Sequence, residues 1–148
     1  MKIVIQSVKR SWIKSRDHQW KLLGVGAIKK WAVVYVWFCE WDDEVKIEKF
    51  VGKIFNLPIF DDQSWKISLS LENIKGELIV VPNFTLCGRN KKWTSLDYSK
   101  ALSFKRGQQL YDYLKTLLKD KPVHFGEFWS YMEIESVVAW PVNLILDL

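Results

Sequence analysis

The chain has 148 residues, of which 49% are hydrophobic and 26% charged, and its formal net charge is +5. These values fit one globular domain and exclude disordered, collagen-like and coiled-coil chains. The longest apolar run, residues 31–39, is too short to cross a bilayer, and the polar Gln6 comes too early for a signal peptide. We therefore expect a single domain over residues 1–148, located in the cytoplasm and away from membranes.

The cysteines and histidines predict neither a disulfide framework nor a metal site. Cys39 and Cys87 are too few for such a framework, and a reducing compartment is the default for such a chain. His18 and His124 do not lie at metal-ligand spacing from each other or from a cysteine. We expect no metal and no cofactor.

Tryptophan is unusually frequent, with nine Trp against seven Gly. Glycine normally makes up about 7% of a protein, whereas tryptophan is rare, so this inversion needs a cause. One possible cause is the stacking of aromatic side chains on nucleic acid.

The positive charge is concentrated in one part of the chain. Between Leu86 and Lys121 there are nine basic residues and three acidic ones. This excess would attract a polyanion such as nucleic acid. The alternative interpretation is a solvated, lysine-rich face of a helix.

The first part of the chain predicts strands followed by one helix. Alternation and β-branched residues predict strands at residues 2–10, 21–25 and 31–39, with a turn at 17–19. The third of these is apolar throughout, which is typical of a central, buried strand. Asp42 and Asp43 can cap a following helix, and Pro58 ends it.

The second part predicts further strands around a long helix. The strands are expected at residues 66–70, 77–81, 123–125, 130–138 and 142–148. Cys87–Tyr98 is predicted to be a polar, basic loop, and an amphipathic helix is predicted from about Ser99 to Lys119. This order predicts an α/β layered fold with mixed β-sheets and two main helices, not a doubly wound sheet.

Two short segments are candidates for a functional site. In Val80–Leu86 a proline ends an apolar strand and a polar turn follows, which could present backbone N–H groups and the Thr85 hydroxyl. An ordinary exit from a strand is the alternative. In Ala139–Asn143, Pro141 lies between two expected strands, which requires an edge, a bulge or a turn. The sequence contains no evident set of side chains for acid–base or nucleophilic catalysis.

Several segments in a fixed order carry a resemblance to a known family. They are residues 1–8, 50–60, 66–71, 76–81, 82–86 and 140–143. Together they resemble the D-aminoacyl-tRNA deacylases, also called D-tyrosyl-tRNA deacylases, over the whole chain. Pro82–Leu86 stands where that family has Ser-Gln-Phe-Thr-Leu, and Trp140–Asn143 stands where it has Gly-Pro-Val-Thr.

The resemblance implies an enzyme that hydrolyses the ester of mischarged D-aminoacyl-tRNA to free amino acid and tRNA, with Gly-tRNA as a further candidate substrate. It implies a homodimer with its active sites at the interface, and water activated by the tRNA 2′-hydroxyl. The implied catalytic residues are Phe84, Thr85 and Leu86. The implied substrate-binding residues are Pro82, Asn83, Met132, Trp140, Pro141 and Val142, and the tRNA contacts are Arg89, Lys91 and Lys92.

The chain also departs from the family pattern. Pro82, Asn83 and Asn143 differ from it, and Ser7 replaces an arginine that braces the Gly-Pro loop. Pro82 is similar to the animal-type relatives, which are less strict about chirality, so strict selectivity for D-residues is open. A catalytically impaired tRNA-binding protein, or a relative resembling an editing domain, is the alternative function.

Most tryptophans fall where the family commonly has glycine. These are Trp31, Trp37, Trp41, Trp65, Trp93, Trp129 and Trp140, with Trp20 as a further candidate. Our hypothesis is that UGA codons meaning glycine in the source organism have been translated as tryptophan. UGG at codons 31, 65 and 140 would end this hypothesis, which also predicts UGG at codon 12. The alternative is a genuine Trp-rich homologue.

Overall fold

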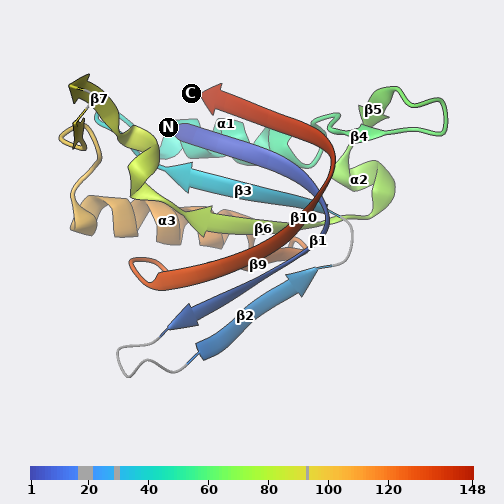
Figure 1. Cartoon of the computed structure of the whole chain (residues 1–148), viewed down its shortest axis with the longest axis horizontal. Helices are drawn as coiled ribbons and strands as arrows, with labels where there is room; N and C mark the ends of the chain where they lie inside the picture. Colours follow the sequence, from blue (N-terminus) through green and yellow to red (C-terminus); the bar gives the residue numbers. More distant parts are fainter. Residues whose placement is uncertain (17–21, 29–30, 93) are drawn as a thin grey trace.

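A curled six-stranded sheet with two long helices against one face forms the body of the protein (Figure 1). The computed structural model describes residues 1–16, 22–28, 31–92 and 94–148, and its description of side chains leaves out residues 16, 22–28 and 139–141. The expected turn at 17–19 and the residues Trp20 and Trp93 therefore lie outside the described residues.

The sheet is mixed, and its centre is parallel. Its strands follow the order β10 (Tyr131–Asp147), β1 (Lys2–Arg16), β3 (Trp31–Trp37), β6 (Glu77–Pro82) and β9 (Val123–Phe125), and β2 (Leu22–Ile28) pairs with β1. The β3–β6 and β6–β9 pairs are parallel, and the others are antiparallel. The predicted α/β layered architecture is confirmed.

The helices and the smaller elements cover the rest of the chain. The two long helices are α1 (Glu44–Ile54) and α3 (Phe104–Leu118). The short elements are β4 (Phe60–Asp61), β5 (Ile67–Leu69), α2 (Leu71–Ile74), the 3-10 turn η1 (Phe84–Cys87), β7 (Arg89–Lys92) and β8 (Ser95–Asp97). Within the part of the chain that is described, no helix has the length and apolarity needed to cross a membrane.

Both faces of the central strands are buried, as the unbroken apolar sequence of β3 predicts. On one face, Ala32, Val34 and Val36 belong to the main core together with residues of α1 and α3. On the other face, Val33 belongs to a second cluster, to which Met132 and Ile134 of β10 contribute. The curl of the sheet thus brings the start of β10 over the second face.

The predicted cap of α1 is confirmed, whereas α3 begins later than expected. The Asp43 side chain accepts a hydrogen bond from the Lys46 N–H at 3.2 Å. Before α3, the Leu102 N–H donates to the Phe38 carbonyl at 3.0 Å, and Ala101 bridges to Cys39. These contacts hold the segment alongside the residues just after β3, so it cannot join the helix.

Two other expectations about the elements were wrong. Residues 87–98, expected to be a loop, contain the antiparallel β7–β8 hairpin. The two strands expected on either side of Pro141 are one strand, β10. Its register with β1 shifts there, and residues 139–142 lie opposite Ser7 alone. A proline fits here because β10 is an edge strand and an irregular pairing needs no N–H from it.

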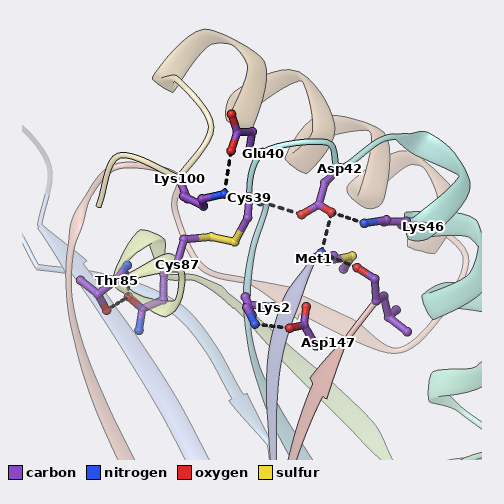
Figure 2. Close-up of a disulfide and its surroundings, with 12 residues drawn as sticks. Met1, Lys2, Cys39, Glu40, Asp42, Lys46, Thr85, Cys87, Lys100 and Asp147 are labelled. Atoms are coloured by element: carbon purple, nitrogen blue, oxygen red, sulfur yellow. Dashed lines mark hydrogen bonds and ion pairs between the residues drawn. A yellow bond between two sulfur atoms is a disulfide. The ribbon is translucent and has the colours of Figure 1, made fainter. Parts of the chain in front are cut away.

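A buried carboxylate, Asp42, fixes the chain where β3 leads into α1 (Figure 2). Its oxygens lie 2.6 Å from the Met1 ammonium nitrogen and 2.7 Å from Lys46 Nζ. The Cys39 N–H donates to the same carboxylate at 2.6 Å. Burial lowers the pKa of the Met1 ammonium, and the Asp42 carboxylate opposes that shift. The interaction with Asp42 therefore offsets part of the cost of burying the Met1 ammonium.

We predict that Asp42→Ala lowers the free energy of unfolding by about 3–5 kcal/mol, because the buried Met1 ammonium loses the carboxylate it contacts and keeps only the Leu148 carbonyl as an acceptor among the described residues. The control is Glu40→Ala, which breaks a 3.2 Å ion pair with Lys100 in which each side chain is 48% exposed. That variant should lose less than about 1 kcal/mol. Urea unfolding measures both, and equal losses would contradict the assignment.

Candidate active site

The turn after β6 lies beside the end of β3. Pro82 is the last residue of β6, and the Asn83 N–H donates to the Val36 carbonyl at 2.9 Å. This bond continues the parallel pairing of Val36 with Pro82 by one step. The turn is therefore held in place by the centre of the sheet.

The polar groups of η1 are bonded to one another. The Asn83 Oδ1 atom accepts from the Thr85 N–H at 3.2 Å and from the Thr85 hydroxyl at 2.6 Å. The Leu86 N–H donates to the Asn83 carbonyl at 3.2 Å. Both N–H bonds lie at the long end of the usual range. The turn thus holds two backbone donors whose acceptors both belong to Asn83.

Glycine is required where the chain leaves this turn. A Cβ atom on Gly88 would lie 2.9 Å from the Thr85 carbonyl oxygen and 2.7 Å from a ring carbon of Tyr98. The Gly88 N–H donates to the same carbonyl at 2.9 Å. Any larger residue would therefore push on the backbone of Thr85.

A disulfide joins the turn to the segment that follows β3, whereas the sequence predicted no disulfide framework and a reducing compartment. Cys87 is bonded to Cys39, and their Cα atoms are 5.9 Å apart (Figure 2). The two residues are 48 positions apart in sequence. They meet because β3 and β6 are parallel neighbours, so the segments that leave the two strands lie at the same edge of the sheet.

A cavity of about 400 Å³ opens beside the turn. Residues at the ends of β3 and β6 and at the start of β10 line it: Tyr35, Trp37, Val81, Pro82, Asn83, Phe84, Trp129, Ser130, Tyr131, Met132 and Ile134. Cavities that bind small molecules commonly have this volume and this mostly apolar lining.

A buried tyrosine fixes the segment that leads into β10. The Tyr111 hydroxyl of α3 donates to the Gly126 carbonyl at 2.8 Å, with the Val80 carbonyl 3.2 Å away. Burial raises the pKa of this hydroxyl, so it stays protonated as a donor. The Gly126 N–H donates to the Val80 carbonyl at 2.8 Å. Tyr111 thus ties one wall of the cavity to β6.

The structure brings together some of the residues predicted to bind substrate. Pro82, Asn83, Phe84 and Met132 line the cavity. Thr85 and Leu86 belong to the adjoining turn and are not among its lining residues.

The other predicted substrate contacts lie on β10. Val142 packs against the main core, whereas Trp140 and Pro141 belong to β10 with side chains outside the described part. Sequence reasoning missed Tyr35 and residues 129–131. The unbroken apolar sequence of β3 carries no alternation that could have indicated Tyr35.

The predicted tRNA contacts lie on the exposed strand β7 of the hairpin. Arg89 and Lys91 lie 2.7 Å and 2.8 Å from one carboxylate oxygen of Asp97. Lys91 and the Ser99 N–H hold the pKa of that carboxyl well below its usual range. Asp97 therefore stays ionised and orients both cations. Lys92 is exposed on the same strand.

The described residues contain no group of three His, Cys, Asp or Glu side chains placed to hold a metal ion.

Comparison with known proteins assigns the chain to a family. The family model described as D-Tyr-tRNA(Tyr) deacylase matches residues 4–147. The D-aminoacyl-tRNA deacylase of Aquifex aeolicus is 35% identical and that of Caldicellulosiruptor saccharolyticus 34% identical, each over 99% of this chain and 97% of that protein. The chain belongs to the D-Tyr-tRNA(Tyr) deacylase family.

Two solved structures have a similar fold. A structure described as c-Myc DNA Unwinding Element Binding Protein superimposes with a TM-score of 0.86 at 27% identity, covering 100% of this chain and 99% of that chain. A probable eukaryotic D-amino acid tRNA deacylase superimposes with a TM-score of 0.83 at 14% identity, covering 99% and 98%. The second shows likeness of fold alone.

We predict that the double variant Cys39→Ser/Cys87→Ser loses about 2–4 kcal/mol of unfolding free energy without reductant, because the cross-link restricts the unfolded chain. Denaturant unfolding measures the loss. In excess dithiothreitol the variant and the parent should become equally stable. If the variant is as stable as the parent under oxidising conditions, the Cys39–Cys87 disulfide does not stabilise the protein as predicted.

Proposed function

We propose that this protein hydrolyses the ester bond of mischarged D-aminoacyl-tRNA, releasing the amino acid and free tRNA. Family membership supports the reaction. In this structure, the main observation in favour of the reaction is a cavity bordered by the turn η1, which is rich in backbone N–H donors. Ester hydrolysis needs donors for the oxyanion that forms on the carbonyl, and backbone N–H groups can supply them. The reaction needs no cofactor.

In the proposed mechanism, the ester carbonyl lies at η1 with the aminoacyl group in the cavity. The N–H groups of Thr85 and Leu86 leave their long bonds within the turn and donate to the oxyanion. One such donor is worth about 10²–10³ in rate. The 2′-hydroxyl of the terminal adenosine activates the attacking water, which is consistent with the absence of an evident general base in the sequence.

We further propose that the active unit is a homodimer. β10 is an edge strand, and its Val137, Val138 and Ile145 side chains are exposed large hydrophobics. Exposed apolar residues along one strand support contact with a second copy. In such a dimer, residues 140–142 of one subunit would approach the cavity of the other and test the chirality of the amino acid. Gly-tRNA, which has no side chain at that carbon, would be a further substrate.

The basic hairpin would meet the tRNA. Arg89, Lys91 and Lys92 are exposed together on β7, and phosphate contacts of this kind position a nucleic acid without reading its sequence. We place the activity in the cytoplasm, where aminoacyl-tRNA is used. Cellular thiols would act there on the Cys39–Cys87 bond.

A second candidate function is tRNA binding without turnover, as in an impaired or editing-type relative. It is favoured by one observation, that Asn83 already accepts from both donors of Thr85. Incubation with D-Tyr-tRNA, L-Tyr-tRNA and Gly-tRNA separates the two functions. The enzyme should release D-tyrosine fastest relative to the uncatalysed rate, whereas binding with no turnover of any of the three would leave only the second function.

We predict that Thr85→Val lowers kcat/KM for D-Tyr-tRNA about tenfold, because it removes the hydroxyl whose hydrogen bond to Asn83 Oδ1, worth about 1.4 kcal/mol, helps to hold the turn that carries the donors. The shape of the side chain is kept. The control is Thr116→Val on α3, which removes a hydroxyl bonded to the Asp112 carbonyl and should leave the rate unchanged. Unaltered kcat/KM in Thr85→Val would argue against a role for this hydroxyl in holding the turn.

We predict that Arg89→Ala and Lys91→Ala each weaken the binding of uncharged tRNA. Each should also reduce the slope of log affinity against log salt by about 1, the amount expected for one lost phosphate contact. Lys49→Ala, on the exposed side of α1, serves as the control of equal charge change. Filter binding at several salt concentrations measures the slopes. If Lys49→Ala behaves like the other two, the hairpin is not a specific contact surface.

A further inference from the structure

Tryptophan occupies backbone positions that suit glycine. Among the described residues, the non-glycine residues with positive φ are Trp41 at 71°, Trp65 at 62°, Lys75 at 50° and Trp129 at 61°. In this region a Cβ atom crowds the backbone, and glycine alone enters it freely. No described glycine has a positive φ. Three of these four residues are therefore tryptophan, the bulkiest residue, in a backbone conformation that disfavours any side chain.

The surrounding turns, not the indoles, set these conformations. The Trp65 N–H donates to the Asp62 carbonyl at 3.1 Å, and the Asp62 N–H donates to the Lys66 carbonyl at 2.8 Å. The side chains of Trp41 and Trp65 are 84% and 72% exposed. Burial of so small a part of each side chain gives little hydrophobic stabilisation to set against the strain of the backbone.

Two further tryptophans are unsuitable for a different reason. The indole N–H groups of Trp31 and Trp37 are buried and have no hydrogen-bond partner among the residues that the structure describes. Buried tryptophan usually finds an acceptor for this group. Trp12 shows neither feature, since its φ is not positive and its indole N–H is not one of these buried, unpaired groups. The Lys14 ammonium lies 4.2 Å from the centre of its ring. The unfavourable environments are thus confined to a subset of the tryptophans.

We propose that positions 31, 37, 41, 65 and 129 are glycine in the protein as its source organism makes it, and that their codons are UGA read as glycine. One decoding difference would convert all of these positions to the same residue and leave a UGG-encoded Trp12 untouched. Independent mutations would produce a mixture of residue types.

Glycine at these positions would also change the shape of the cavity. What this means for substrate binding rests on the proposed function. Trp37 and Trp129 both line the cavity. Trp37 stacks on Phe128 with ring centres 5.2 Å apart, and Trp129 lies 5.6 Å from Phe84. Glycine at both positions removes two indoles from the wall beside η1. Positions 37 and 129 then determine how large an aminoacyl-adenosine the site accepts.

The backbone part of the proposal is tested by melting temperature. Trp41→Gly and Trp65→Gly should each melt about 2–4 °C above the matched Trp41→Ala and Trp65→Ala variants, since only alanine keeps the strained Cβ. Trp12→Gly should melt below the parent, because glycine weakens a strand. Alanine variants as stable as the glycine variants would overturn the assignment of these positions.

The decoding part is tested by the coding DNA and by peptide mass mapping of the protein isolated from its source cells. We expect UGA at codons 31, 37, 41, 65 and 129, UGG at codon 12, and glycine masses for the five positions. UGG codons, or tryptophan in the native peptides, would overturn the proposal. This readout does not use activity, so a protein with glycine at all five positions but no deacylation would count against the proposed function alone.

Discussion

The parallel pairing of β3 with β6 is the constraint on which the rest of the structure depends. The segments that leave these two strands lie at one edge of the sheet, so Cys39 and Cys87 can bond and Asn83 can continue the ladder to Val36. Both strands are almost entirely buried, so their ladder is shielded from water on both faces. The site is therefore held by the buried centre of the sheet.

This arrangement suits chemistry performed by the backbone. The turn offers backbone N–H groups, and its backbone is held by the close approach at Gly88 and by the bond from Asn83 to Val36. In the proposed mechanism these N–H groups exchange their bonds to Asn83 for bonds to the charge that develops on the substrate. In the proposed function the enzyme must also bind tRNA, which is a polyanion. The exposed basic residues of β7, which follows the turn directly, would serve that purpose.

Local signals predicted much of the fold. The apolar run of β3, the Asp43 cap and the turn after Pro82 are each encoded within a few neighbouring residues. The late start of α3 and the Cys39–Cys87 bond depend on contacts between distant segments, which periodicity does not reveal. The same holds for the cavity. Its turn could be predicted from Pro82–Leu86, whereas residues 129–131 reach it only because the sheet curls and Tyr111 anchors Gly126.

The central claim is that the aminoacyl ester is bound against the turn at residues 84–86. Backbone amide NMR with a stable analogue, adenosine carrying D-tyrosine through an amide at the 3′ position, tests it most directly. The account predicts that the amide signals of Thr85 and Leu86 shift on saturation, together with those of cavity residues such as Met132. Saturable binding that shifts signals elsewhere and leaves this turn unchanged would contradict it.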